Sequence, residues 1–409
     1  MPDPRCLIYA MSAFRFTTAG ESHGPALAAV VEGLPAGLPL RADDLDRELR
    51  RRQGGYGRGG RMRIESDRAE ILSGVRHGET LGSPIALLVR NRDWANWTEA
   101  MSPEPVEGDD EAMRRVFFPR PGHADLVGAL KYDRTDARDI LERASARETA
   151  ARVACGAMAK RFLAELGITL GSHVVALGGV VAAVPSDLPD DLNAASDPSP
   201  VRCLDAEAEG RMIDAIDAAK REGDTLGGVV EVVARGLPAG LGSHVSWDAR
   251  LDGRIAGALM SIQAIKGVEI GLGFEGAMRP GSRVHDPIVR DEAARRGGGY
   301  GRSSNGAGGL EGGITTGAPL VARAAMKPIS TLMRPVLPTI DLRTGAPAEA
   351  VRERSDVVAV PAAGVVAEAM LALVLAGAVR EKFGGDSLAE VRANFDGYVD
   401  RIATRAGHG

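Results

Sequence analysis

The chain has 409 residues, of which 44% are hydrophobic and 4% aromatic, and its formal net charge is −5. This length can hold one large domain or two average ones, each with a substantial core. The acidic balance argues against general binding to nucleic acid or to anionic membranes. Three cysteines without metal-type spacing indicate a reducing compartment. We expect a cytoplasmic protein, because no apolar run is interpreted as a membrane-spanning segment and the first ten residues are too weakly apolar for a signal peptide.

Apolar patterns along the chain predict both strands and helices. Strands are expected at residues 14–18, 26–32, 71–73, 85–90, 168–177, 229–234 and 320–325. Helices are expected at 43–52, from Asp136 to about residue 166, and at 205–221, 249–263, 362–383 and 387–406. The helix at 362–383 is apolar on all sides and should be buried in the core or at a subunit interface. Because regular β-α-β alternation is missing, we predict an α+β layered fold.

Two sequence motifs occur twice. Gly-Leu-Pro-Ala-Gly-Leu stands at 33–38 and again at 236–241, each time after a predicted strand and before a predicted helix. Gly-Gly-Tyr-Gly-Arg stands at 54–58 and again at 298–302. Chance recurrence of glycine-rich segments is one explanation, but the matching order favours two related halves packed as one unit.

Two of the seven histidines lie in short segments flanked by glycine. His23 follows Gly-Glu-Ser, and His123 stands within Arg120-Pro-Gly-His-Ala-Asp125. Glycine allows a tight turn or close approach of a ligand, and histidine moves protons near neutral pH. Together with nearby arginines, they indicate a proton-handling pocket for an anionic substrate. The alternative is a pair of hydrogen-bonded turn histidines without a chemical role.

Two further segments concentrate positive charge. Residues 50–63 combine arginines with glycines that can offer backbone N–H groups to an anion, and no phosphate-loop or dinucleotide fingerprint accompanies them. The alternative is a solvated basic loop, and we expect few packing contacts there. Arg143 and Arg147 are spaced to share one face of a helix. The alternative for these two is an ordinary surface face paired with Glu142 or Glu148.

Two segments in the last third of the chain could serve a flat, charged ligand. Small residues fill 303–313, where a planar group could approach closely, and Lys327, Ser330 and Thr331 supply hydrogen-bond donors nearby. Asp356, next to Arg354 and Ser355, could accept a proton beside a bound charge. An exposed ion pair is the alternative for Arg354 and Asp356.

In combination, these motifs resemble the chorismate synthase family. The resemblance covers residues 14–388, and neither the lead before Met11 nor the tail after residue 388 touches a motif. The segments that carry it are 20–24, 50–60, 120–125, 143–148, 263–271, 307–313, 327–331 and 354–356.

The resemblance implies the reaction and the cofactor. 5-Enolpyruvylshikimate 3-phosphate would lose phosphate and a ring proton in a 1,4-anti elimination that yields chorismate, in the shikimate pathway of aromatic amino acid biosynthesis. Reduced FMN would be required although no net redox change occurs. A β-α-β sandwich of antiparallel sheets around helices, assembled as a homotetramer, is also implied. We expect one domain over 11–409 with two related halves, and residues 1–10 as a disordered extension or a mis-assigned start before Met11.

Residue by residue, the resemblance implies that His23 protonates or neutralises the departing phosphate and that His123 stabilises the reduced, partly anionic flavin. Asp356 would help to deprotonate the flavin N5 region after it has taken the substrate hydrogen, while Ser22 and Ser145 orient hydrogen bonds. The positions that match FMN contacts are Arg143, Ala144, Ser145, Gln263, Ala264, Gly312, Lys327, Pro328, Ile329, Ser330, Thr331 and Arg354.

Four arginines are assigned to the substrate anions, namely Arg52, Arg58, Arg120 and Arg147. Arg52 and Arg58 also match NADP contacts in the family, so these two remain divided between substrate and NADP. NADPH could act as an indirect reductant through an external flavin reductase, or the chain could reduce its own flavin. The competing functions are an NAD(P)H-dependent flavin reductase and a flavin-binding module without turnover.

Overall fold

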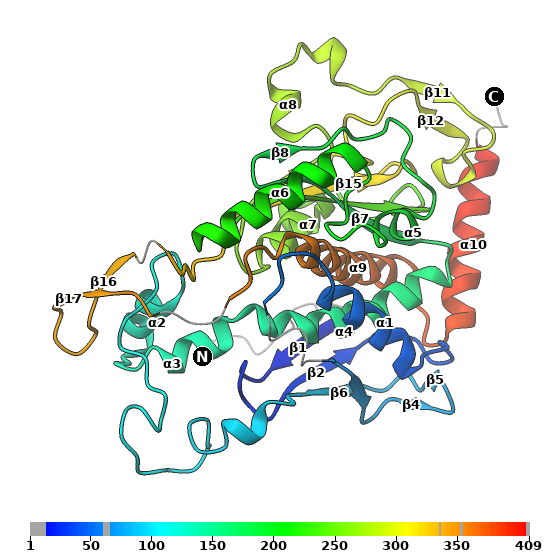
Figure 1. Ribbon diagram of the computed structural model, residues 1–409. Helices are drawn as coiled ribbons and strands as arrows, with labels where there is room; N and C mark the ends of the chain where they lie inside the picture. Colours follow the sequence, from blue (N-terminus) through cyan, green and yellow to red (C-terminus); the bar gives the residue numbers. More distant parts are fainter. Residues whose placement is uncertain (1–13, 60–65, 335–336, 352–354, 406–409) are drawn as a thin grey trace, which may run out of the picture.

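The computed structural model describes residues 14–59, 66–334, 337–351 and 355–405, so the expected extension at 1–10 lies outside them. Two antiparallel sheets enclose a layer of helices (Figure 1). The first sheet has the strand order β1 (Arg15–Ala19), β2 (Ala26–Glu32), β6 (Ile85–Arg90), β3 (Ala69–Ile71). The second has the order β10 (Ile265–Ile270), β15 (Leu320–Met326), β9 (Gly228–Arg235), β7 (Thr169–Leu177), β8 (Val180–Val181). The mixed α and β class with antiparallel sheets is therefore as predicted.

The helical layer consists of α1 (Ala42–Gln53), α4 (Thr149–Ala164), α7 (Leu251–Met260) and α9 (Val360–Phe383). Helices α1 and α4 pack on the first sheet, α7 and α9 pack on the second, and α4 lies along α9. Outside this layer lie α2 (Asp125–Tyr132), α3 (Arg138–Ala144), α5 (Leu192–Ser196), α6 (Ala206–Glu222), α8 (Gly273–Ala277) and α10 (Leu388–Arg405). Small hairpins pair β4 (Val75–Arg76) with β5 (Glu79–Thr80), β11 (Ile288–Arg290) with β12 (Tyr300–Arg302), β13 (Leu310–Glu311) with β14 (Ile314–Thr315), and β16 (Pro338–Ile340) with β17 (Pro347–Glu349).

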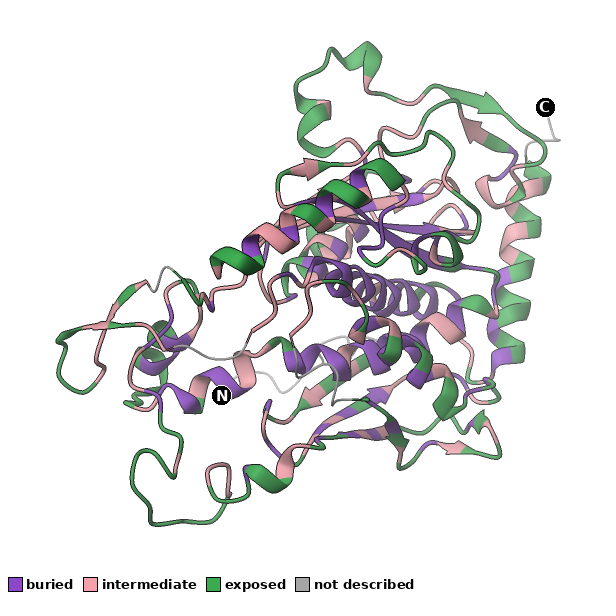
Figure 2. Ribbon diagram, viewed as in Figure 1, coloured by how far each residue is buried: buried purple, intermediate pink, exposed green. Residues whose placement is uncertain are grey.

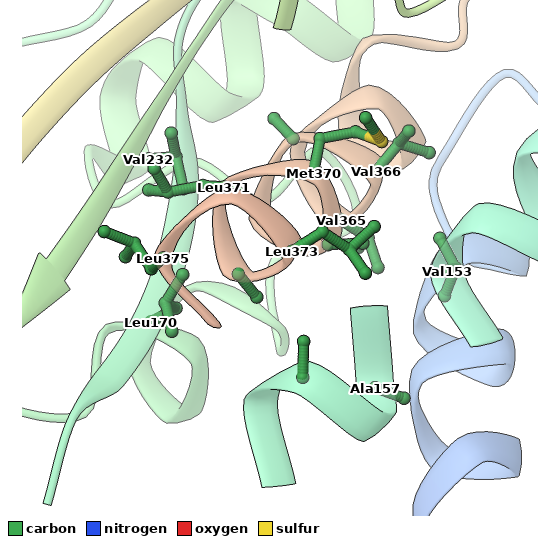
Figure 3. Packing of buried hydrophobic residues seen from close by; sticks show 14 of the residues in the cluster. Val153, Ala157, Leu170, Val232, Val365, Val366, Met370, Leu371, Leu373 and Leu375 are labelled. Carbon is green, nitrogen blue, oxygen red and sulfur yellow. The ribbon is translucent and has the colours of Figure 1, made fainter. Parts of the chain in front are cut away.

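Helix α9 is the centre of the core, as its uniformly apolar sequence predicts (Figure 2). In Figure 3, Leu371 and Leu375 lie toward Val232 of β9 and Leu170 of β7, while α4 occupies another side. Contrary to our reading of the sequence, this helix is long and apolar enough to span a membrane. Because 94% of its most apolar window is buried inside the protein, we assign it as a core helix.

Close contact between α4 and α9 depends on a glycine. A Cβ atom built on Gly156 of α4 would lie 2.3 Å from the Cβ atom of Ala369 and 2.5 Å from its Cα atom. Two helices that approach this closely leave no room for a methyl group, because protein interiors are packed at the density of organic crystals. The alanine-rich sequence of both helices therefore reflects the short distance between them.

The two Gly-Leu-Pro-Ala-Gly-Leu segments are anchored in the same way. The Thr80 hydroxyl donates to the carbonyl of Pro35 at 2.6 Å and accepts from the Leu38 amide at 3.0 Å. The Thr315 hydroxyl donates to the carbonyl of Pro238 at 2.6 Å and accepts from the Leu241 amide at 2.8 Å. The strand order β1-β2-β6-β3 in one sheet also parallels the order β7-β9-β15-β10 in the other.

The two Gly-Gly-Tyr-Gly-Arg segments, in contrast, are not anchored in the same way. Arg58, at the end of the first Gly-Gly-Tyr-Gly-Arg segment, lies in a loop after α1. The second segment forms strand β12 instead, and its Arg302 pairs with Glu311 at 2.8 Å on an exposed hairpin. The similarity of these two pentamers therefore does not extend to their conformation.

Two of the predicted elements were wrong, and strand β10 was missed. The helix expected from Asp136 to residue 166 is broken at Ser145, whose φ of −61° and ψ of 140° are extended. Residues 186–200 are rich in proline, aspartate and serine, which predicts a surface loop, but part of this segment forms the short helix α5. Strand β10 contains Lys266 and a glycine, and its register shifts between Ile265 and Gly267, so no regular alternation marks it.

We predict that Gly156→Ala destabilises the fold by about 1–3 kcal/mol, because the added methyl group overpacks the α4–α9 contact. Gly210→Ala is the matched control, since a Cβ atom there meets nothing within 4 Å and the residue lies within α6. That control should stabilise the fold by about 0.5–1 kcal/mol. Chemical denaturation of both variants measures the difference, and equal effects would contradict the close helix contact.

Candidate active site

A cavity of about 460 Å³ opens where loops from both halves of the chain meet the first turns of α9. Its walls come from the turn at 22–23, the end of α1 with its following loop, the turn at 120–124 and the break between α3 and α4. Segments 262–264, 326–331 and 355–366 complete the lining. Its volume is typical of a small-molecule site. The cavity thus gathers motifs that are separated by more than 300 positions in the chain.

His23 lines this cavity from the turn between β1 and β2. The turn requires Gly20, whose φ is +104° and where a Cβ atom would lie 2.4 Å from the carbonyl oxygen of Ala26. The Nδ1 atom of His23 lies 2.9 Å from both carboxylate oxygens of Glu142. Burial would raise the pKa of Glu142, but hydrogen bonds and charge from His23 and Arg138 lower it below its usual value.

His123 lines the cavity from the turn that precedes α2. Its Nδ1 atom is hydrogen bonded to Asp125, which is fully buried and also accepts from Nε of Arg120 at 2.8 Å. Burial would raise the pKa of Asp125, but the hydrogen bonds from His123 and Arg120 hold it well below its usual range. Each of the two histidines is therefore held by an ionised carboxylate that an arginine also binds.

The break at Ser145 positions the residues around it. The Ser145 side chain accepts a hydrogen bond from the Arg147 amide, and its hydroxyl lies 3.3 Å from that of Ser22. Because the helix is interrupted, Arg143 and Arg147 do not share a face as we predicted. Arg143 donates to the carbonyls of Thr18 and Gly20, while Arg147 contacts Asp67 and lines the cavity.

Among the residues that the structure describes, four guanidinium groups line the cavity, and each is nearly buried: Arg52, Arg58, Arg120 and Arg147. Arg147 contacts both carboxylate oxygens of Asp67 at 2.6 Å, and Arg52 lies 3.6 Å from the same carboxylate. Arg52 also donates to the Thr149 hydroxyl at 2.8 Å. These contacts orient the guanidinium forks before any anion binds, which suits the recognition of phosphate or carboxylate.

Asp356 meets the glycine–arginine loop directly. Its carboxylate accepts from the Gly59 amide at 2.6 Å and pairs with Arg58 at 2.9 Å. The loop also packs tightly, since a Cβ atom on Gly57 would lie 2.8 Å from the Val358 side chain. Our expectation of a loop with few packing contacts was therefore wrong, because the glycines allow the backbone to approach the start of α9.

The residues at the expected flavin positions fall into two groups. Those that line the cavity are Ala144, Ser145, Gln263, Ala264, Lys327, Ile329, Ser330 and Thr331. Within the described ranges, Arg143, Pro328 and Gly312 lie outside the lining. Gly312 forms the tip of the β13–β14 hairpin near His244. Arg354 falls outside the described residues.

The cavity wall at Gln263 carries a polar atom that suits a ligand. Gln263 donates to Glu148 at 3.2 Å, but its buried Oε1 atom has no hydrogen-bond partner in the described part of the chain. The next residue, Ala264, has a φ of +66°, a strained value for alanine, and its carbonyl accepts from the Lys327 amide. Buried polar atoms in proteins are nearly always satisfied, so this atom is placed to accept a hydrogen bond from a bound ligand or an ordered water.

Sequence reasoning missed the acidic partners of these groups. Asp125 stands in the same motif as His123, so the spacing could have indicated it. Glu142 entered only as a surface partner for Arg143, yet it binds His23 from 119 positions away. Asp67 approaches Arg147 across 80 positions, and no local pattern connects them.

A cavity that combines two carboxylate-bound histidines with buried arginines defines an enzyme that moves protons on a small, multiply anionic substrate. The family model of chorismate synthase matches residues 14–379. A chorismate synthase from Symbiobacterium thermophilum is 60% identical over 96% of this chain and 100% of its own length. One from Geobacter sulfurreducens is 59% identical over 95% of this chain and 99% of its own.

A crystal structure of chorismate synthase superimposes with a TM-score of 0.74 at 48% identity, covering 96% of this chain and 98% of that one. The chain therefore belongs to the chorismate synthase family, which makes it a lyase that eliminates phosphate. This assignment agrees with the resemblance drawn from the motifs.

Acid should weaken the fold through Asp125. Its pKa lies below the ordinary value of 3.8, so its ionised form stabilises the protein above that pH, and this contribution is lost as the pH falls toward the folded-state pKa. Asp125→Asn should be less stable at neutral pH. Its free energy of unfolding should also fall less steeply than that of the wild type between about pH 5 and about pH 2, where the unfolded chain takes up a proton that the folded protein does not.

Denaturation at several pH values measures this slope. The exposed carboxylate of Asp187 provides a control, and Asp187→Asn should keep the wild-type slope. An Asp125→Asn slope equal to that of the wild type would contradict the assigned ion pair.

Proposed function

We propose that this chain converts 5-enolpyruvylshikimate 3-phosphate into chorismate by 1,4-anti elimination of phosphate. The observation that carries the proposal is the convergence of His23, His123 and four buried arginines on one cavity. The C–O bond to phosphate breaks with its electron pair, and the existing ring double bond shifts to the carbon that loses phosphate. The C–H electrons form the second double bond as the ring proton leaves. The arginines match a substrate with one phosphate and two carboxylates.

We propose specific roles for the chain's own side chains. His23 holds a proton toward the departing phosphate, and its bond to Glu142 keeps the ring oriented. His123, whose ring is held by Asp125, would stabilise the reduced, partly anionic flavin from a second point of the cavity wall. Asp356 receives a proton next to Arg58, and Ser22 and Ser145 orient hydrogen bonds between the two halves of the site.

We propose that reduced FMN is the cofactor and that the cavity holds its ring system. The buried Oε1 atom of Gln263 fits the ring N–H of a flavin, and Ala264, Ile329 and nearby alanines of α9 offer small apolar contacts. When bound, reduced flavin supplies electron density to the substrate as phosphate leaves and recovers it afterwards. Arg52 and Arg58 line the same cavity as the histidines, which supports substrate over NADP as their ligand.

We further propose a single domain built from two pseudo-duplicated halves and assembled as a cytoplasmic homotetramer. The matching strand orders and the equivalent Thr80 and Thr315 anchors support duplication. Exposed large apolar side chains support association, among them Trp247 at 85% and Met278 at 87% exposure. NADPH serves as an indirect reductant through an external flavin reductase, in keeping with the missing dinucleotide fingerprint.

The purified chain should release phosphate from 5-enolpyruvylshikimate 3-phosphate only with reduced FMN under anaerobic conditions. Oxidised FMN with NADPH should support turnover only after a flavin reductase is added. A phosphate assay with each combination tests both points. Equal release with oxidised flavin alone, or no release with reduced flavin, would refute the proposed reaction.

His23→Ala and His123→Ala should each lower the turnover rate by about 10- to 1000-fold, as expected for a positioned acid or base. Both side chains extend from turns, so circular dichroism and melting should show a folded protein. His285→Ala removes an exposed histidine outside the cavity and should retain wild-type turnover. Full activity in either cavity variant would contradict its catalytic role.

A further inference from the structure

We propose that Glu142 is the positioning residue of His23, setting both the direction of its ring and the nitrogen that exchanges protons with the substrate. The inference rests on the proposed function, because His23 is the group that serves the departing phosphate. Glu142 lies in α3, which is far from His23 in the sequence, and it is only 2% exposed.

Helix α3 holds the His23 turn at three points. The Glu142 carboxylate accepts from the His23 amide at 2.8 Å and lies 2.9 Å from its Nδ1 atom. The backbone carbonyl of Glu142 accepts from the Ser22 amide at 3.0 Å. The same residue therefore fixes the backbone that carries the imidazole and the ring itself.

The carboxylate also determines the tautomer of the ring. An ionised glutamate only accepts hydrogen bonds, so Nδ1 of His23 must carry a proton in this contact. Proton exchange with a ligand in the cavity then falls to Nε2. The pKa of Glu142 supports its ionised form, since His23 and Arg138 lower it despite its burial.

A second contact keeps the ring in one plane. His23 stacks on Trp97 with ring centroids 3.8 Å apart and an interplanar angle of 23°. Trp97 is itself fixed by a hydrogen bond from its indole nitrogen to Asp93 at 2.9 Å. The π face of an indole favours a positive charge beside it, so this stack adds to the effect of Glu142 on a protonated ring.

Two cations of the described residues flank the stacked rings. Arg138 of α3 donates to Glu142 at 2.9 Å and lies 5.2 Å from the Trp97 ring centroid. Arg114, from the loop before α2, lies 4.0 Å from the same centroid. These cations oppose a charged imidazole, whereas the carboxylates of Glu142 beside His23 and of Asp93 beside Trp97 carry the opposite charge.

Turnover provides the first test. Glu142→Gln keeps the shape of the side chain but removes its charge, and kcat should fall by about 10- to 100-fold, as for other groups that orient a reactive histidine. KM for the substrate should change little, because Glu142 does not line the cavity. Glu142→Asp, which restores the charge, should recover part of the rate.

Glu231→Gln is the matched control for these kinetics. It removes a buried carboxylate from another histidine, His173, which lies 3.0 Å away on the second sheet and outside the cavity. The control should retain wild-type kcat even where it lowers stability, so a loss in both variants would point to a general effect of removing buried charge.

Trp97 fluorescence provides a readout that does not depend on turnover. The chain has three tryptophans, so Trp94→Phe with Trp247→Phe leaves Trp97 as the sole emitter. The imidazole stacked on the Trp97 indole should quench its emission at one fixed, neutral pH. Glu142→Gln should raise this emission, because a ring that the carboxylate no longer holds leaves the stacked position more often. His23→Asn in the same background should raise the emission further, since it removes the imidazole.

The outcomes separate this proposal from the proposed reaction. Unchanged Trp97 emission overturns the positioning role even if kcat falls, and an unchanged kcat overturns it even if the emission rises. If Glu142→Gln does not fold, Glu142→Asp should show smaller changes of the same sign in both measurements, and no change in either would overturn the proposal. A wild-type protein without turnover, in which Trp97 emission still responds to Glu142→Gln as expected, would refute the reaction alone.

Discussion

The carboxylate of Glu368 connects most of the layers of this protein. It lies in α9 with no exposed surface, and its pKa is strongly lowered because Lys160 and Arg51 outweigh the cost of burial. Its hydrogen-bond donors come from α1, α4, β7, α5 and the loop before α6: Arg51, Lys160, Ser172, Asn193 and Arg202. A buried charge is tolerated only when it is fully paired, so these elements must assemble together.

The ion pairs of Glu368 are linked to the active site by short chain segments. Arg51 stands next to Arg52, which lines the cavity, and the first turns of α9 before Glu368 form the opposite wall. The cavity repeats the same chemistry, since carboxylates of Asp67, Asp125 and Glu142 hold its arginines and histidines in place. Buried ion pairs thus orient side chains both in the core around Glu368 and in the active site. In the active site, they place the guanidinium groups and imidazole rings before the substrate binds.

Sequence patterns predicted those helices and strands whose apolar residues pack into the core. Strand β6 and helix α9 follow from their continuous apolar runs, and α6 follows from its Asp205 cap and amphipathic pattern. The helix break at Ser145 escaped prediction because alanine, arginine and glutamate continue through it with high helix propensity. Its cause is tertiary: Ser145 and Arg147 turn toward Ser22, in the turn between β1 and β2, and Asp67, just before β3.

The amino-acid sequence by itself determined the mixed α and β class, the buried central helix, the family, and the motifs that line the cavity. These depend on local periodicity and on long runs of residues in a specific order. Only the tertiary structure decided which acid binds which base, that Gly312 and Arg302 lie away from the cavity, and that Glu142 holds His23. The contacts of Asp67, Glu142 and Asp356 join chain segments that are 80, 119 and 297 positions apart, and no local sequence pattern marks the closure of such long loops.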